Sequence, residues 1–313
     1  MKLLRSAALA LLLLVATLGV LAAWTRSAGA LAQARIPLIL AATAFYSAGS
    51  VVFSAIWALL LSGLRSGRTA AGPVRMSHFR AFRVGVVSLA GLLTPMNIAT
   101  DVLRSMLGRR YLGVDLASTA AASIVTRESK LHVTLVLLPV VVAATGVSAT
   151  EHRGRMLGAL AGLLALALVL AAFRSDVARS LARSLGIGHL AETTRELHRQ
   201  ISWGTRGAVY LVFAAGFAAE WEALRLCFQA LGVPPDVGVT LAAYATLFFL
   251  SRTPVVPLGI GIMEGAGLAW LRMVHVPLEQ AGAIIVLWSG LRVVVPHLLA
   301  AASFATFACV TRT

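Results

Sequence analysis

Charged side chains inside two apolar stretches are the residues of this sequence that could do chemistry. In LLTPMNIATDVLRSML, Asp101 and Arg104 stand three residues apart, so on a helix they share one face. In GIGIMEGAGLAW, Glu264 has its nearest basic residue at Arg272. A carboxylate in apolar surroundings must find a partner or hold its proton, and arginine matches phosphate oxygens bidentately. These residues indicate binding of a charged group. Glu264 is expected either to pair with an arginine of the first half or to carry a coupling proton.

Three further charged residues are candidates for the same site. In FAAEWEALRLC, Glu222 and Arg225 share a helix face and can pair, whereas Glu220 points away from both. Glu220 is therefore a second candidate for proton coupling. Arg127 and Arg292 close two Ala-rich segments at equivalent places. Snorkelling to a membrane interface explains each arginine, and gating or head-group contact is the alternative.

Two Thr-Pro pairs precede the two acids. Thr94 and Pro95 have the form of an N-cap followed by proline at the first helical position. A helix that starts there directs free N–H groups and a partial positive charge at the break in the chain. The second stretch offers similar candidates at Thr253, Pro254, Gly259 and Gly261, where the glycines allow close approach of the backbone. Ordinary helix kinks are the alternative interpretation.

The elements that must position these residues are membrane helices. The 313 residues are 59% hydrophobic and 12% charged, with a mean hydropathy of +0.87, far from the composition of soluble domains. Apolar runs long enough to cross a hydrocarbon core occupy residues 7–24, 37–61, 131–149, 156–173, 207–231 and 293–309. Two regions, 84–126 and 239–288, are apolar but interrupted. The composition predicts an all-α polytopic membrane protein with about six to eight transmembrane helices.

The basic excess is explained by membrane topology. The formal net charge of +15 lies mostly in loops, which is typical of positive-inside orientation and of contact with anionic lipid head groups. No basic stripe belongs to a soluble module, so nucleic-acid binding is not expected. Lys2 and Arg5 before the first helix predict a cytoplasmic N-terminus, and the loop count places the C-terminus there too. The polar segment 174–206 is predicted as a cytoplasmic amphipathic linker.

The two interrupted regions resemble each other. Each has an apolar limb, a Thr-Pro, a polar break, one acid and a new helix, then a G-V or H-V linker, an Ala-rich limb and a closing arginine. The chain is therefore predicted as one membrane domain, 1–313, with a first half at 37–173 and a second at 207–313. Each half holds a re-entrant hairpin, near 84–126 and near 239–288. By the loop count the two hairpins are inverted, as in many secondary transporters.

Motifs of enzymes and metal sites are missing from the sequence. It contains no GxSxG, HExxH, Walker loop or His/Cys cluster. Cys227 and Cys309 lie in apolar helices without ligand spacing and are interpreted as packing residues. The sequence predicts no metal, no cofactor and no catalytic residue, and the chain is not expected to be an enzyme.

Taken together, these motifs resemble the lysylphosphatidylglycerol synthase transmembrane-region family, also described as flippase-like. The resemblance rests on the Thr-Pro, acid and arginine of the first half and on Gly259, Gly261 and Glu264 of the second. It implies a membrane module with re-entrant segments that moves lipids, in some members aminoacylated phosphatidylglycerol, between leaflets. The family acid falls on Asp101, where glutamate is usual, and its arginine on Arg104. Ala99 and Thr100 replace the usual Gly-Gly.

The sequence therefore favours a lipid transporter of the bacterial inner membrane. Its expected partners are membrane lipids, particularly those with anionic head groups. The acyltransferase domain of the full-length synthases would follow the last helix, whereas this chain ends at Thr313. Lipid synthesis by this chain is therefore not expected, and a lipid-biosynthetic enzyme is a candidate partner. The alternatives are an intramembrane subunit of a transferase that acts on lipids or lipid-linked glycans, and a scaffold for such a transferase.

Overall fold

The computed structural model describes residues 27–62, 68–69, 72–73, 77–93, 98–144, 190–234, 236–250 and 262–310. These residues are almost entirely helical, which confirms the expected helical class. A two-residue antiparallel strand pair, β1 (Arg68–Thr69) with β2 (Gly72–Pro73), is the exception. The predicted apolar runs at 7–24 and 156–173 lie outside the described residues.

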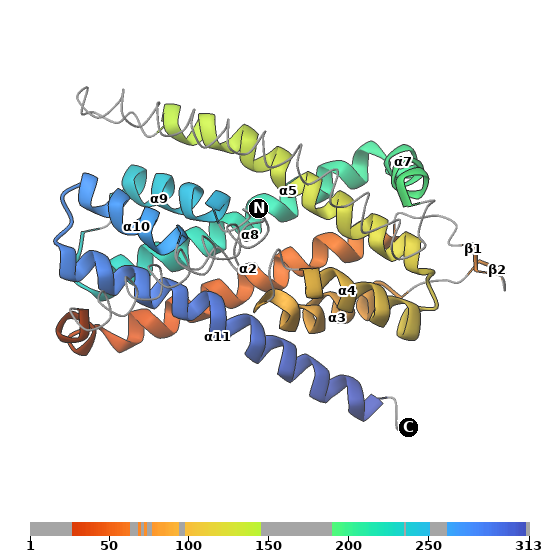
Figure 1. The fold of residues 1–313 in the computed structure, drawn as a ribbon, viewed down its shortest axis with the longest axis horizontal. Helices are drawn as coiled ribbons and strands as arrows, with labels where there is room; N and C mark the ends of the chain where they lie inside the picture. Colours follow the sequence, from red (N-terminus) through yellow and green to blue (C-terminus); the bar gives the residue numbers. More distant parts are fainter. Residues whose placement is uncertain are drawn as a thin grey trace, which may run out of the picture.

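Four long helices run roughly along the long axis of the molecule, and shorter helices pack between them (Figure 1). The long helices are α2 (Ile36–Ser62), α5 (Leu116–Ala144), α8 (Trp203–Ala230) and α11 (Leu278–Val310). The shorter elements are α3 (His78–Val87), the 3-10 helix η1 (Ser88–Leu93), α4 (Ile98–Leu107), the π turn η3 (Gly108–Leu112), α7 (Leu190–Gln200), α9 (Val237–Leu250) and α10 (Ile262–Met273). Helices α3 and α4 lie towards one end of the long axis, and α9 and α10 towards the other.

Two of the described helices are long and apolar enough to cross a membrane, Ile36–Ser62 and Leu278–Ala305. Helices α5 and α8 are of similar length but carry several charged side chains, so their apolar character is lower. Long helices of this composition agree with the polytopic membrane class.

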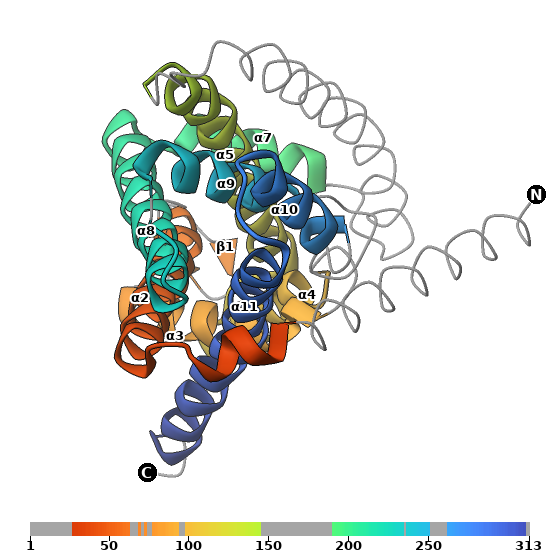
Figure 2. The ribbon, with the colours of Figure 1, turned by 90° about the vertical axis from the view of Figure 1, so that its left-hand side faces the viewer.

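Helices α2 and α8 pack against each other in antiparallel directions, and Figure 2 shows them side by side. At the start of α2, the amide of Arg35 donates a 2.9 Å hydrogen bond to the carbonyl oxygen of Ala230 at the end of α8. Further along, the ring of Phe53 lies 5.3 Å from the ring of Phe213. As the residue number rises along α2, the number of its partner falls along α8.

Small residues bring the two helix backbones close together. A Cβ atom added to Gly49 would lie 2.6 Å from Cγ of Glu220 and 3.0 Å from the carbonyl oxygen of Gly216. Close approach through glycines is typical of membrane helices, because without a strong hydrophobic driving force in lipid they associate largely by packing. The absence of a side chain at Gly49 therefore makes room for Glu220 inside the α2–α8 seam.

An aromatic cluster fills the centre of the helix bundle. Neighbouring ring centroids in it are 4.5 to 6.3 Å apart, many of them edge-on, as aromatic pairs prefer. The rings belong to Tyr46, Phe53, Phe213, Phe217, Tyr244, Phe248 and Trp288, from α2, α8, α9 and α11. These contacts hold the second half of the chain against α2.

Two predicted helix boundaries differ from the structure. The hairpin predicted near 84–126 and the apolar run predicted at 131–149 leave a break at 127–130, and Arg292 was expected to close a segment. Helices α5 and α11 instead continue through these positions. The segment SIVTRESKLHV contains no glycine or proline, and every backbone group in apolar surroundings must be hydrogen-bonded, so the helix continues. The charged residues that suggested loop ends therefore lie inside long helices.

The predicted linker at 174–206 is helical where it is described, except at residues 201 and 202. Helix α7 and the first turn of α8 occupy its second part, and residues 174–189 lie outside the described residues. Leu197 of α7 is fully buried, and α7 packs on α5. The Nε2 atom of His198 lies 2.8 Å from a carboxylate oxygen of Glu128. The apolar side of α7 is thus covered at least in part by the protein.

Replacing Gly49 with alanine should destabilise the protein, because the new methyl group would overlap Glu220 and the α8 backbone. We expect a loss of about 1–3 kcal/mol, typical of overpacking. The control is Gly207→Ala in α8, where an added Cβ has no neighbour within 4 Å. Thermal unfolding in detergent compares the two variants, and equal transition temperatures would contradict the close α2–α8 contact.

Candidate functional site

The first charged cluster joins α4 to α5. Asp101 lies in the first turn of α4, and its Oδ2 atom forms an ion pair with Nη2 of Arg127 from the interior of α5. Nη1 of Arg104 lies 4.0 Å from the other oxygen of Asp101, an ion-pair distance too long for a hydrogen bond. The structure thus brings together three residues selected from the sequence, Asp101, Arg104 and Arg127. Two arginines meet one acid, so these three residues together carry a positive charge.

Contacts with η1 and α2 fix the position of Arg104. Its side chain is buried, and its Nε donates a 3.0 Å hydrogen bond to Oγ of Ser88. Ser88 in turn donates to the carbonyl oxygen of Gly85 at 2.6 Å. The guanidinium carbon of Arg104 lies 5.9 Å from the centre of the Trp57 ring, within the range of a cation–π contact. Arg104 is therefore held in a defined orientation beside the acid.

The second charged cluster joins α10 to α11. Glu264 lies in the first turn of α10 and accepts a 2.7 Å hydrogen bond from Oγ of Ser289. Nη1 of Arg292 lies 3.9 Å from the same carboxylate oxygen, and both side chains are about nine-tenths buried. From the sequence, either an arginine of the first half or a proton was expected to neutralise Glu264. In the structure, Glu264 is paired with Arg292, which belongs to the same half of the chain.

The two clusters are built in the same way. Each acid lies in the first turn of a short helix, and its arginine lies well inside the long helix that follows. Between the two helices of each unit the chain passes through one left-handed residue, Gly113 at φ 66° and His275 at φ 67°. A left-handed residue ends a helix and lets the chain reverse. The G-V and H-V linkers noted in the sequence are these two reversals.

Glu220 occupies a separate position in the α2–α8 seam. It is buried and accepts a 2.9 Å hydrogen bond from the hydroxyl of Tyr244 in α9. On the same helix, Glu222 accepts hydrogen bonds of 2.7 and 2.8 Å from Arg225, which confirms the pairing predicted from their spacing. The expectation that Glu220 takes no part in that pair agrees with its hydrogen bond to Tyr244.

Several buried polar atoms near the first cluster have no hydrogen-bond partner among the described residues. Thr100 precedes Asp101, Ser123 lies one turn before Arg127 on α5, and Trp57 lies against Arg104. The unpartnered atoms are Oγ1 of Thr100, Oδ1 of Asp101, Oγ of Ser123 and Nε1 of Trp57. Buried polar atoms are normally hydrogen-bonded. The surroundings of this cluster therefore have unused capacity to bind a polar group.

Six of the predicted site residues lie outside the described residues. They are Thr94, Pro95, Thr253, Pro254, Gly259 and Gly261. Helix α4 starts at Ile98 and α10 at Ile262, shortly after these positions. The N-caps proposed at Thr94 and Thr253 therefore stay predictions.

Sequence reasoning missed the two serines that hold the clusters. Ser88 and Ser289 stand in apolar segments without any motif, and serine is common in membrane helices, so their types alone carried no signal. Ser88 lies 16 residues from Arg104, and Ser289 lies 25 residues from Glu264.

Among the residues that the structure describes, no group of three His, Cys, Asp or Glu side chains has the arrangement of a metal site.

The comparison with known families agrees with this architecture. Residues 5–300 match the family described as "Lysylphosphatidylglycerol synthase TM region". The chain belongs to this family. The match confirms the resemblance found in the sequence and, with the apolar helices, identifies a membrane protein. It extends over both charged clusters and over all the predicted site residues. Comparison with curated proteins and with solved structures gives no match.

Removing the Ser88 hydroxyl, which accepts a hydrogen bond from Arg104, should destabilise the protein. In Ser88→Ala the Nε–H of the buried guanidinium loses its acceptor, and we expect a cost of about 1–3 kcal/mol. The control is Ser123→Ala, because the Ser123 hydroxyl has no partner among the described residues and its removal should be neutral or slightly stabilising. Thermal unfolding of both variants tests the difference, and an equal loss would contradict the supporting role of Ser88.

Breaking the second pair from one side should cost more than removing both of its charges. In Arg292→Gln the Glu264 carboxylate stays buried without its arginine, and we expect a loss of up to about 3 kcal/mol. The double variant Glu264→Gln with Arg292→Gln has no charge left at this pair, so it should recover part of the lost stability. Thermal unfolding measures both effects. A double variant less stable than Arg292→Gln would mean that the two side chains do not act as a pair.

Proposed function

We propose that this protein moves a phospholipid, an aminoacyl-phospholipid or a related lipid between the leaflets of the bacterial inner membrane. The observation that carries the proposal is the matched acid–arginine pair in each half of the chain. Charged side chains are costly inside a membrane protein and mark ion or substrate pathways. Two such pairs in corresponding places favour a transport path over packing alone.

The proposal includes an inverted repeat in which α2, α3, α4 and α5 correspond to α8, α9, α10 and α11. Its first support is that the corresponding helices α2 and α8 are antiparallel neighbours. Its second support is reciprocal packing, because α5 contacts α9 and α8 while α11 contacts α3 and α2. Inverted repeats in secondary transporters place the substrate site near the bilayer midplane, where discontinuous helices meet.

Helices α4 and α10 serve in this proposal as the returning limbs of two re-entrant hairpins. They have 10 and 12 residues, so even α10 is only about 18 Å long, against a hydrocarbon core of about 30 Å. Each carries its acid in the first turn, where backbone N–H groups are free and the helix dipole is positive. Two short helices that start inside the membrane would direct these groups at a shared polar path.

The pairs also suggest how binding and movement are connected. A lipid phosphate that binds Arg104 and Arg127 competes with Asp101 for the same guanidinium groups. The released carboxylate cannot stay charged and unpaired in apolar surroundings, so it takes up a proton or a counter-cation. If a head group binds Arg292, Glu264 likewise takes up a proton or a counter-cation. Glu220 is the further candidate for proton uptake. In this proposal, substrate binding is linked to the protonation of these acids.

The orientation follows from the arginines. In the proposed topology both termini are cytoplasmic, and so is the end of the molecule that holds α7 and the start of α3. Positively charged residues concentrate on the cytoplasmic side of membrane proteins. A lipid-biosynthetic enzyme on that side is a candidate partner, because it would deliver the lipid to be moved.

The test is a leaflet-accessibility assay in vesicles that contain the purified protein. Head-group-labelled phosphatidylglycerol, its lysyl ester and a neutral lipid are compared in parallel. We expect Glu264→Gln to slow protein-dependent exchange at least about tenfold, which corresponds to about 1.4 kcal/mol in the moving step. The matched control is Glu279→Gln, an exposed glutamate in the first turn of α11. Near-normal exchange in Glu264→Gln would remove Glu264 from the mechanism.

The family description contains the word "synthase". This word favours a second candidate function, that of a membrane subunit or scaffold of a lipid-biosynthetic transferase. The same vesicles separate the two functions. If none of the three lipids exchanges faster than in empty vesicles, and the protein copurifies with such an enzyme whether or not Glu264 is replaced, the scaffold explains the result better than transport.

A further inference from the structure

One outer surface of the molecule gathers exposed arginines. Helix α3, helix α4 and the turn η3 are neighbours in space. Arg80, Arg109 and Arg110 are exposed there, and Arg83 is half-buried. Arg80, Arg109 and Arg110 form no ion pair with any described residue. We call this surface, including the apolar residues described next, the α3–α4 arginine face.

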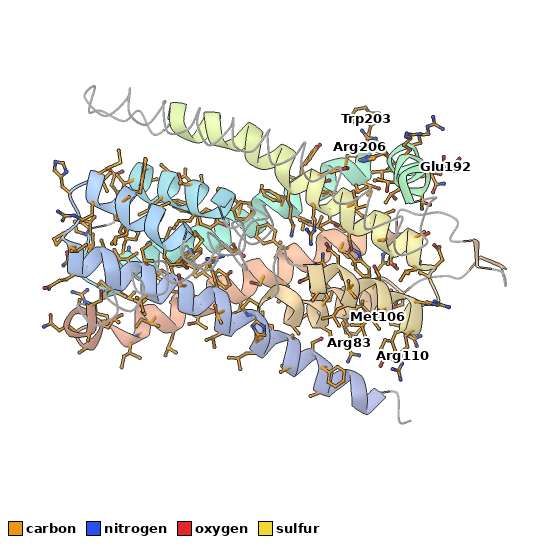
Figure 3. All side chains as sticks on the ribbon, in the orientation of Figure 1. Arg83, Met106, Arg110, Glu192, Trp203 and Arg206 are labelled. Carbon is orange, nitrogen blue, oxygen red and sulfur yellow. The ribbon has the colours of Figure 1, made fainter. Side chains whose placement is uncertain are left out.

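Exposed apolar side chains lie among these arginines. On α4, Val102 and Met106 stand one turn apart and point outwards, with Met106 61% exposed. On α3, Phe79 is 66% exposed, and the guanidinium carbon of Arg83 lies 5.8 Å from its ring centre. Figure 3 shows Met106, Arg83 and Arg110 on the same side of the molecule. The face thus combines an apolar strip with cations at its border.

The turn that carries Arg109 and Arg110 is held firmly against the protein. It is a π turn, Gly108–Leu112, that ends at the left-handed residue Gly113. A Cβ at Gly108 would lie 2.6 Å from Cγ2 of Thr119, so the turn packs directly on α5. The guanidinium carbon of Arg110 lies 5.5 Å from the centre of the Tyr111 ring. Two consecutive arginines are thereby presented at the surface on a fixed backbone, and π turns often occur at functional sites.

A second exposed surface at the same end of the molecule differs in charge. At the start of α8, Trp203 is 84% exposed, and the guanidinium carbon of Arg206 lies 5.0 Å from the centre of its ring (Figure 3). Acids and bases alternate along α7, with Glu192, Arg195, Glu196 and Arg199 in one helix. The charges of these four residues cancel, and Arg206 adds one positive charge to this surface. An anionic partner would therefore prefer the α3–α4 arginine face.

We propose that the α3–α4 arginine face docks a phospholipid with an anionic head group at the membrane surface. The phosphate contacts Arg109 and Arg110, with Arg80 and Arg83 nearby, and the acyl chains lie along Met106 and Val102. An apolar strip bordered by arginines matches the two parts of such a lipid, and basic clusters beside membrane helices attract anionic lipids. This docking is independent of the Asp101 cluster and does not require transport.

The test measures lipid binding by native mass spectrometry of the whole delipidated protein. Phosphatidylglycerol and phosphatidylcholine with identical acyl chains are titrated separately. We expect wild type to bind phosphatidylglycerol more tightly, and Arg109→Gln with Arg110→Gln to weaken that binding about 25-fold, or about fivefold for each arginine. Binding of phosphatidylcholine should change little.

The matched control is Arg195→Gln with Arg199→Gln on α7, which removes two exposed arginines from the second surface at the same end. It should keep the preference for phosphatidylglycerol, and so should Arg109→Lys with Arg110→Lys, which preserves the charge. Equal binding of the two lipids by wild type would overturn the proposal, and so would an equal loss in the α7 control. Failure of the exchange assay with intact binding would affect the transport proposal alone.

Discussion

The pairing of two acids, the half-buried Asp101 and the buried Glu264, with arginines is the constraint on which the rest of the structure depends. Asp101 and Glu264 lie in apolar parts of the chain, where an unpaired carboxylate is far more costly than in water. Each is neutralised by an arginine more than 20 residues away, on the following long helix. Each pair therefore fixes the start of the short helix that carries the acid against the long helix that carries the arginine. The short helix and the long helix thus form one structural unit.

The central bundle lies between these two units. Helices α2 and α8 approach closely at Gly49, and the aromatic cluster connects them to α9 and α11. Trp288 belongs to that cluster and directly precedes Ser289, which holds Glu264. On the other side, Nζ of Lys130 lies 4.9 Å from the centre of the Phe53 ring, one turn after Arg127 on α5. The packed core thus touches the helix turns that carry both arginines.

The two pairs differ in ways that bear on the proposed function. The first has two arginines for one acid. The second has one arginine, one acid and a serine hydroxyl bound to the carboxylate. An anion is therefore attracted more strongly to the first cluster. The second cluster carries no net charge, so the two halves need not play equal parts in moving a lipid.

Much of the candidate site could be predicted from the sequence because it follows local patterns. The two acids, the matched linkers at Gly113 and His275, and the closing arginines are visible as repeated residue types at similar spacing. The Glu222–Arg225 pair follows from helical geometry alone, because the two residues are three apart. Such features depend on neighbours within a few residues, which the sequence displays directly.

The continuous helices at 127–130 and at Arg292 were not predicted, because charged residues there suggested the membrane surface. Their charges are tolerated inside long helices since tertiary contacts neutralise them, Arg127 with Asp101 and Arg292 with Glu264. The part played by Ser88 likewise depends on a helix contact that no local pattern encodes.

By itself, the sequence determined the helical membrane class, the internal resemblance of the two halves and the residues able to carry charge in apolar surroundings. Only the tertiary structure decided which arginine neutralises each acid, and that the partner of Glu220 is Tyr244 on α9. The physical reason is that a buried charge is stabilised by whichever partner the packing brings within a few ångströms. Packing between distant helices depends on the shapes of all the side chains at their contacts, which residue types and spacing do not specify.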